Sequence, residues 1–444
     1  MKQTPTHLLT LACIALSLSG CSSLTQTPYT RPEGAMPQSW SQQVDPKAME
    51  TDHWWQQFAD QKLNRLMNTA LARNTDLAVA ALQVRKAQLQ AELAASELLP
   101  SVSVGGSGEL SRNLGSSSTE TRSFRASTTV SYELDLWNKL GSTSDAARWE
   151  AMATEEDRQG VALSLTGTAA SLYWQIGYLN QRVALSQASI DYARQTLTLV
   201  QVQKAAGAAT GLEILEAERS LASQEASHTQ LLQQRIEARN ALTILLDGPP
   251  QSTPTEELAD MHGVRLPGVD SGIPAQLLGR RPDLRAAEAR LRATLAQGDA
   301  TRASYYPSIN LSGSYGGASE QLSRLLSNPI ATLGADLLLP FVQWRDMQRN
   351  IKISETEYQQ AVLNFRQTLY TALAEVENSL SARKQYRVQA EKLEASLTAA
   401  RQSEALYRLR YQAGATSLQT WIDAQEKRRQ AEINLAENQY NQLQ

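Results

Sequence analysis

Histidine and cysteine, which often catalyse reactions or bind metals, are few and scattered in this sequence. His7, His53, His228 and His262 lie far apart, and no two of them share the spacing of metal ligands. We find no phosphate-binding loop, no nucleophile elbow and no Cys/His pair. The sequence therefore predicts neither an enzyme nor a metal site nor a dissociable cofactor.

Cys21 is the one side chain for which the sequence indicates a specific chemical role. It closes the segment Leu18-Ser19-Gly20-Cys21, which ends an apolar run that begins at Leu8 and follows Lys2. Such a run is too short to span a bilayer as a helix and is typical of a secretory signal. The closing segment resembles the cleavage box of bacterial lipoproteins, in which the cysteine becomes the first residue and carries a covalent lipid. An ordinary secretory signal with an incidental cysteine is the alternative.

The sequence around Cys21 sets the first two domain boundaries. Residues 1–20 are the predicted lipoprotein signal peptide, and residues 21–52, rich in Pro, Gln, Ser and Thr, are a predicted extended, lipidated tether. Ser22, and not an Asp, follows the cysteine. In bacterial lipoproteins this implies passage to the outer membrane. Cys13 leaves with the signal, so the mature chain is expected to have one cysteine and no internal disulfide.

Four stretches alternate between apolar and polar residues, the pattern of a strand with one apolar and one polar face. The clearest is Phe124 to Asp135, whose even positions are mostly apolar and whose odd positions are all polar or charged. Ser101 to Ser111 and the stretches 308–315 and 331–341 behave similarly. The sequence therefore predicts two strand hairpins, at residues 101–135 and 307–341.

The rest of the chain has a helical pattern that occurs twice. A helix, a strand hairpin, a very long helix, a glycine turn and a return helix make up residues 53–246, and again residues 273–444, with an irregular connector at 247–272. Each long helix would measure about 100 Å. Matching residues share an offset of 207: Asp76 and Asp283, Pro100 and Pro307, Trp137 and Trp344, Gly207 and Gly414, Ala217 and Ala424. A common offset across most of the chain indicates an internal duplication.

Charge and hydropathy restrict the partners of this chain. The formal net charge of -3 gives no reason to expect a nucleic-acid partner. After the signal, no segment has the ~18 apolar residues that a membrane-spanning helix needs, so a bilayer crossing would use the strands. Four strands cannot close a barrel, and open edges are not tolerated in lipid. Two copies would supply eight strands and a filled interior, whereas three would supply twelve.

Several short motifs occur in order along nearly the whole mature chain. They are Tyr132-Glu133-Leu134-Asp135-Leu136-Trp137, Asn240-Ala241-Leu242, Arg280-Arg281-Pro282-Asp283-Leu284, Ala374-Glu375-Val376-Glu377, Tyr411 with Gly414, and Asp423-Ala424-Gln425. With these motifs the chain resembles the outer-membrane efflux factors, the TolC-like channel proteins, and in particular their lipid-anchored branch. The resemblance implies a mainly α fold with a small β part: a long α-helical coiled-coil barrel and a transmembrane β-barrel shared between three protomers.

The resemblance also implies a function and partners. The homotrimer would be the outer-membrane channel of a tripartite efflux or export system for drugs or other small toxic compounds. It would contact outer-membrane lipid, a periplasmic adaptor (membrane fusion) protein and an inner-membrane pump of the RND type. The sequence stops at Gln444 without the short apolar, Gly-rich tail usual in the family, so the last helix is expected to be shortened.

The family narrows its pore near the two glycine turns, which places candidate gate residues there. By position from the shared glycine, Asp423 and its repeat counterpart Glu216 match one acidic place in the family, and Glu213 matches another. Tyr411 matches the tyrosine of the constriction. Rings of acidic side chains favour cations in a pore. Solvated charges on an exposed helix are the alternative for all of these acidic residues.

The turns themselves are the candidate adaptor-contact tips. They comprise Gly207, Ala208, Thr210 and Leu212 in the first repeat, and Gly414, Ala415, Thr416 and Leu418 in the second. We expect an exposed leucine after each small-residue turn to make the contact. The basic motif Arg280-Arg281-Pro282-Asp283 is better explained as a helix start, with Pro in the first turn and Asp283 at the positive helix end, than as an anion site.

A coiled-coil envelope lipoprotein with a structural role and no pore is the competing function. The polar faces of the strands discriminate between the two. Arg125, Glu133 and Asp135 on one face, opposite Tyr132 and Leu134, are needed by an aqueous lumen and not by a packed structural sheet.

Overall fold

The computed structural model describes residues 25–41, 53–114, 120–250, 256–261, 263–268 and 274–444. Cys21, the predicted signal peptide and the tether residues 42–52 lie outside the described residues. The chain divides into two compact units. The first comprises Met1–Ala35, Ala81–Arg158 and Leu278–Tyr370, and the second comprises Met36–Ala80, Gln159–Leu277 and Thr371–Gln444.

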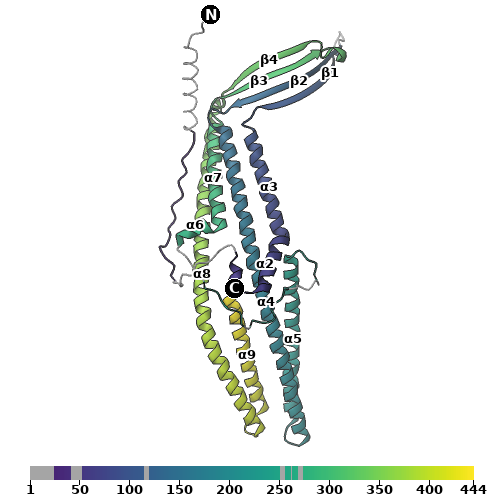
Figure 1. Cartoon of the computed structure of the whole chain (residues 1–444), viewed down its shortest axis with the longest axis vertical. Helices are drawn as coiled ribbons and strands as arrows, with labels where there is room; N and C mark the ends of the chain where they lie inside the picture. The colour runs from purple at the N-terminus through teal and green to yellow at the C-terminus, as the bar shows by residue number, and fades with distance from the viewer. Residues whose placement is uncertain (1–24, 42–52, 115–119, 251–255, 262, 269–273) are drawn as a thin grey trace. The chain divides into compact units, whose positions relative to one another are not determined.

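The first unit contains one sheet of four antiparallel strands (Figure 1). These are β1 (Ser101–Arg112), β2 (Glu120–Leu134), β3 (Ser308–Ser319) and β4 (Pro329–Leu338), and the sheet order β1-β2-β3-β4 follows the sequence. Four strands were predicted, and the described residues contain four. The second hairpin is shorter than the predicted range 307–341, because Pro340 has no N–H for the ladder and begins the 3-10 turn Pro340–Val342 instead.

The register places the apolar positions of all four strands on one face of the sheet. Val130 lies between Val102 and Gly313, and Gly313 in turn pairs with Leu333. Glu133 pairs with Asn310, and Asn310 with Asp336, on the other face. Four strand patterns that the sequence shows separately therefore make one continuous apolar face and one continuous polar face.

The junctions between strands and helices are fixed by specific polar contacts. The carboxylate of Asp135, just after β2, accepts hydrogen bonds from the backbone N–H groups of Leu140 (3.1 Å) and Gly141 (2.8 Å) at the start of α4 (Lys139–Ala205). The indole N–H of Trp137 donates to the carbonyl oxygen of Pro307 at 2.8 Å, next to β3. The two hairpins are thus tied together where they meet the helices.

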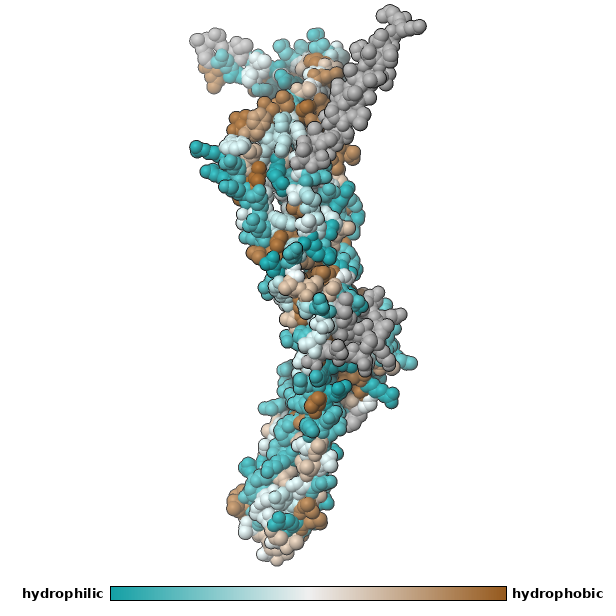
Figure 2. Space-filling view, turned by 90° about the vertical axis from the view of Figure 1, so that its left-hand side faces the viewer, coloured by the Kyte–Doolittle hydropathy of each residue, from teal (hydrophilic) through white to brown (hydrophobic). Residues whose placement is uncertain are grey.

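Besides the start of α4, three helices that lie wholly or partly in the first unit come from the predicted repeats. The helix α3 (Thr75–Ser96) precedes β1, α7 (Pro282–Ala303) precedes β3, and α8 (Trp344–Gln412) follows β4. Pro282 is at the start of α7 with Asp283 in its first turn, so this part of the basic motif is a helix start as predicted. Burial alone would raise the pKa of Asp283. The hydrogen bond from Arg281, the positive charge of Arg281 and the hydrogen bonds from backbone N–H groups together outweigh burial and hold that pKa below its usual value. Figure 2 shows hydrophobic residues near the junction of strands and helices, whereas the helical surface is largely hydrophilic.

The second unit contains the two helical hairpins and a small core beside them. Its helices are α2 (Gln61–Arg73), the later parts of α4 and α8, α5 (Gly211–Leu245) and α9 (Leu418–Leu443). The long helices α4 and α8 have 67 and 69 residues, about 100 Å each. Among the helices of the described residues, none is both long and apolar enough to cross a membrane.

The sequence analysis predicts one helix before the first strand hairpin, but the structure divides this helix into α2 and α3. Helix α2 ends at Arg73 because Asn74 adopts an extended conformation. The Asn74 side-chain oxygen accepts a hydrogen bond from the N–H of Leu77 (3.0 Å), and its amide nitrogen donates to the carbonyl oxygen of Leu245 (3.0 Å). Asn74 therefore starts α3 and anchors it to the end of α5.

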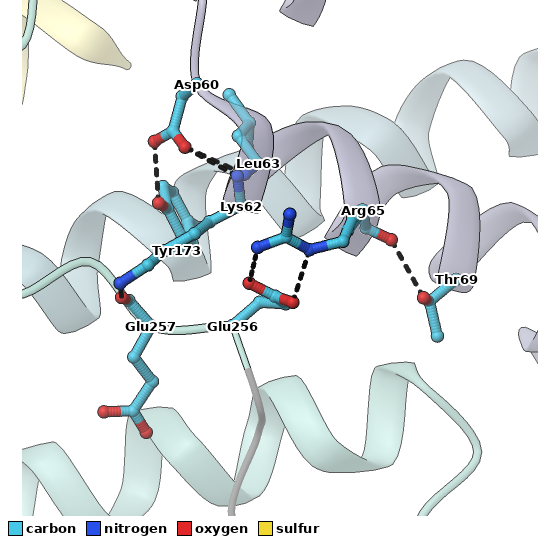
Figure 3. A network of polar contacts seen from close by, with 8 residues as sticks. All are labelled: Asp60, Lys62, Leu63, Arg65, Thr69, Tyr173, Glu256 and Glu257. Carbon is cyan, nitrogen blue, oxygen red and sulfur yellow. Dashed lines mark hydrogen bonds and ion pairs between the residues drawn. The ribbon is translucent and has the colours of Figure 1, made fainter.

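The connector after α5 packs against α2 and α4 through a polar network (Figure 3). The guanidinium of Arg65 holds the carboxylate of Glu256 with two hydrogen bonds, at 2.7 and 2.9 Å. Asp60 begins α2 and accepts a hydrogen bond from the buried hydroxyl of Tyr173 on α4, at 2.7 Å. The connector thus lies on α4 at a fixed place, where Leu258 covers Gly177.

This close approach predicts opposite effects of one substitution at two glycines of α4. A Cβ at Gly177 would lie 2.5 Å from Leu258 Cδ2, whereas a Cβ at Gly167 meets no atom within 4 Å. Alanine in a helix is favoured over glycine by about 1 kcal/mol, and overpacking costs about 1–3 kcal/mol. Gly167→Ala should raise the melting temperature in detergent, and Gly177→Ala should lower it. An equal rise for both variants would show that Leu258 does not hold the connector against α4.

Candidate functional site at the two helical turns

The two glycine turns have the same backbone structure, and both lie at one end of the second unit (Figure 1). Gly207 (φ 81°) and Gly414 (φ 71°) are both left-handed. Ala208 N–H donates to the carbonyl of Gln203, and Ala415 N–H to that of Arg410, each at 2.8 Å. This bond pattern closes the ends of α4 and α8, and it needs a residue that tolerates positive φ.

Each return helix begins with a side-chain cap. In the first turn, Thr210 Oγ1 accepts from the N–H of Glu213, and the Glu213 carboxylate accepts from the N–H of Thr210 at 2.8 Å. In the second, Ser417 Oγ accepts from the N–H of Thr420 at 3.3 Å. Glu213, a candidate gate residue, is therefore part of a capping box. The pattern Thr-x-x-Glu before an apolar run is the sequence signal of this cap.

The two turns differ in the exposure of the leucine that follows the glycine. Leu212 is 65% exposed, with Gly207, Ala208 and Thr210 exposed beside it. Leu418 is 0% exposed, so the prediction that it is an exposed contact residue is wrong. It is buried because the second turn folds over a cluster of apolar side chains of its own chain. Gly414 and Ala415 are exposed, and Thr416 is half-buried.

That cluster joins the two helical hairpins near their turns. Its buried members come from both repeats: Val200 of α4, Ala217 of α5, Tyr411 of α8, and Leu418, Trp421 and Ile422 of α9. Burial of such side chains stabilises by roughly 1.5–3 kcal/mol each. The turn regions are therefore held together by hydrophobic packing within one chain.

Tyr411 contributes both a ring and a hydroxyl to this contact. Its ring stacks on Trp421 with the centroids 5.3 Å apart, and its hydroxyl donates to Gln203 Oε1 of α4 at 2.7 Å. Burial, and then the negative charge of Glu213, raise the pKa of Tyr411 above its usual value. Through its hydroxyl, Tyr411 links α8 to α4.

Glu404 is a buried carboxylate in the same region that sequence reasoning missed. It accepts hydrogen bonds from the Tyr192 hydroxyl of α4 (2.5 Å) and from the Trp421 indole N–H of α9 (2.9 Å). Burial of Tyr192, together with its hydrogen bond to Glu404, raises the pKa of Tyr192 to about 12. The repeat position of Glu404 in the first copy is Leu197. A charged residue in one repeat whose counterpart in the other repeat is apolar is the sequence signal that would have identified Glu404.

The remaining candidate gate residues do not belong to this buried contact. Asp423 is exposed and accepts a hydrogen bond from the Gln419 amide at 2.6 Å, and Glu216 is half-buried. They occupy matching places on α9 and α5, nine residues after Gly414 and Gly207. Among the residues that the structure describes, no three His, Cys, Asp or Glu side chains are grouped to hold a metal ion.

Comparison with known proteins gives consistent matches over nearly the whole chain. Residues 66–248 and 273–444 match the model of the family described as outer membrane efflux protein. The chain is 33% identical over 452 residues to the pyoverdine export outer membrane protein OpmQ of Pseudomonas putida, and the match covers 99% of this chain and 95% of that protein.

Solved structures show the same fold. The open-state MtrE outer membrane channel of Neisseria gonorrhoeae superposes with a TM-score of 0.83 at 26% identity, and 94% of this chain matches 95% of that one. A crystal structure of CusC has a TM-score of 0.82 at 27% identity, and 94% of this chain matches 96% of that one. The family match, the sequence identity and the common fold lead to one conclusion: this chain belongs to the outer membrane efflux protein family.

Proposed function

We propose that three copies of this chain form a conduit that crosses the outer membrane through a shared twelve-stranded barrel and continues into the periplasm as a helical tube. The open sheet supports this proposal most directly. It has one apolar face, and within the described residues β1 and β4 each pair on one side only. Unpaired backbone groups cost several kcal/mol each in lipid, so each edge needs a partner strand. A second copy pairs with the sheet at one of these edges. A third copy pairs with the two edges that remain and closes the ring.

The helices beside the two free edges support the same assembly. Helix α3 leads into β1 and exposes Leu82, Leu89 and Leu93, whose spacing places them on one face. Helix α8 follows β4 and exposes Ile353 and Leu363. The β1–α3 side of one copy would thus meet the β4–α8 side of the next. This contact is head-to-tail and closes into a ring.

The exposed first turn supports a contact between the conduit and partner proteins. Gly207, Ala208 and Leu212 form a small, partly apolar tip suited to contact with a periplasmic adaptor protein, which would join the conduit to an inner-membrane pump of the RND type. The cargo would be drugs or other small toxic compounds. Relatives with export functions support this role, and the polar sheet face with Arg125, Glu133 and Asp336 fits an aqueous lumen rather than a purely structural lipoprotein.

Lipidation of Cys21 is the first testable part of this proposal. Cys21→Ser should abolish metabolic labelling of the protein with palmitate, because no other thiol follows a lipoprotein-type box. The assembled trimer should persist, since a single acyl anchor adds little beside a barrel. Labelling at the wild-type level in the variant would refute the anchor.

The two sheet faces predict different results for arginine at adjacent positions of β4. Leu333 is 91% exposed on the apolar face, and Thr332 is on the polar face, paired with Ser314. Arginine facing the bilayer midplane costs about 2–4 kcal/mol. Leu333→Arg should therefore reduce the amount of trimer in the outer membrane, whereas Thr332→Arg should assemble normally and change the conductance in planar bilayers. Equal assembly defects in the two variants would contradict the conduit.

Asp423 gives a third prediction, on the assumption that its three copies surround the narrow end of the tube. Asp423→Ala should raise the single-channel conductance, because the contacts that hold the narrow end closed are weakened. It should also reduce the preference for cations, because a ring of negative charge is removed. Glu437→Ala is the matched control, since it removes an exposed charge from the same helix about 21 Å farther from the turn. If the two variants behave alike at equal trimer levels, Asp423 is a surface charge.

A further inference from the structure

Hydrogen bonds reinforce the hydrophobic packing between the two helical hairpins of one chain, which we call the hairpin contact. The hydroxyl of Tyr192 on α4 donates to the buried carboxylate of Glu404 on α8 at 2.5 Å, and the indole of Trp421 on α9 donates to the same oxygen at 2.9 Å. Nearer the turns, the ring of Tyr411 stacks on Trp421, and its hydroxyl donates to Gln203 of α4 at 2.7 Å. The first repeat is thus bonded to the second repeat at two levels.

The internal duplication predicts which residues form the equivalent contact between copies. In the proposed head-to-tail ring the two repeats alternate, so the second repeat of one copy lies beside the first repeat of the next. Each residue pair of the hairpin contact then has a counterpart between copies, obtained by moving both residues to the other repeat by the offset that separates Gly207 from Gly414. Both glycine turns have the same left-handed residue and the same hydrogen bonds, so this offset holds at the turn end of the helices.

The hydrogen bond farther from the turns has no polar counterpart between copies. Tyr192 corresponds to Ala399, and Glu404 corresponds to Leu197. Neither alanine nor leucine has a side-chain donor or acceptor. A phenol bound to a buried carboxylate is therefore replaced by a small apolar pair.

The hydrogen bond nearer the turns is replaced by two positive charges. Gln203 corresponds to Arg410, and Tyr411 corresponds to Lys204. Both of these cations have hydrogen-bond donors and no acceptor, so they cannot bond to each other, and their like charges repel. Both side chains are exposed in the single chain, so both are available for a contact with a neighbouring copy.

Acidic side chains near the turns also favour the hairpin contact. The negative charge of Glu213 acts on Tyr411 there, and its counterpart between copies is the uncharged Thr420. Glu216 and Asp423 are counterparts of each other, so an acidic residue at this place does not distinguish the two contacts. The difference between the contacts therefore lies in the carboxylates and aromatic rings that belong to one repeat only.

One polar pair of the hairpin contact is retained between copies. The Gln425 amide donates to the Thr196 hydroxyl at 3.5 Å, and the counterparts of this pair, Glu218 and Ser403, can also form a hydrogen bond. A length of 3.5 Å lies beyond the usual range of hydrogen bonds, so this pair adds little to either contact.

We propose that the narrow end of the conduit opens at the seams between copies, and that the two hairpins of each chain move together when it opens. A seam is the contact of α8 of one copy with α4 of the next, where Arg410 faces Lys204. This proposal rests on the proposed function. The hairpin contact has stacked rings and a buried, hydrogen-bonded carboxylate, whereas the seam has short apolar side chains and two like charges. A widening of the tube separates the weaker of the two contacts.

Charge reversal at Lys204 and Arg410 tests the seam. Lys204→Glu and Arg410→Glu each place opposite charges across it, so each should reduce the single-channel conductance of trimers in planar bilayers. The double variant again places like charges there and should return to the wild-type conductance. Two residues that act independently on ions in the pore would instead give reductions that add. Additive reductions, or an unchanged conductance in both single variants, would overturn the proposal.

A cross-link between copies tests the seam without reference to charge. Trimers that carry both Lys204→Cys and Arg410→Cys are treated with a reducible bifunctional thiol reagent, with the two single-cysteine variants as controls. Denaturing electrophoresis should show covalent trimers for the pair alone, and the conductance should fall and recover when a reductant is added.

The other results of the cross-linking experiment have distinct meanings. Covalent trimers that conduct as the unlinked ones do would show that opening occurs within the chains. An absence of links between chains would show that Lys204 and Arg410 do not meet, and it would also overturn the proposal. A wild-type protein that gives no conductance would overturn the proposed function, and this proposal with it.

Discussion

The structure depends on one constraint: a backbone N–H or C=O group in lipid must have a hydrogen-bond partner. Within the sheet, neighbouring strands in the order β1-β2-β3-β4 supply each other's partners. The outer edges of β1 and β4 need partner strands from other copies. Continuous apolar and polar faces follow from the register, and the apolar faces of α3 and α8 lie beside the open edges. An isolated protomer is therefore unsuited to lipid.

The internal duplication gives the two halves of the chain the same architecture. Residues that differ between the repeats make the contact between the two helical hairpins. Both glycine turns have the same left-handed residue and the same hydrogen bonds. Tyr411, Trp421 and Glu404 have Lys204, Ile214 and Leu197 at the matching places of the first repeat. Because these three side chains occur in the second copy alone, the second hairpin packs over the first, and the exposed leucine remains at the first turn.

The sequence predicts the parts of the fold that depend on local periodicity, and fails where distant contacts decide. Alternation along the strands and the repeat offset located four strands and both long helices. The burial of Leu418 could not be predicted, because it depends on Trp421 and on Val200 of another helix. The break at Asn74 likewise depends on the carbonyl of Leu245. The capping role of Glu213 was predictable from the Thr-x-x-Glu pattern. The family resemblance instead implies a place for Glu213 in an acidic ring. Cys21 lies outside the described residues and stays a prediction.

The number of copies in the assembled particle tests the central claim most directly. Native mass spectrometry of protein extracted from outer membranes in mild detergent measures it without reference to any single residue. We expect one species with three times the mass of the processed, lipid-modified chain, since three copies provide the twelve strands that close both edges of every sheet. A stable monomer, or a dimer, as the main species under these conditions would contradict it.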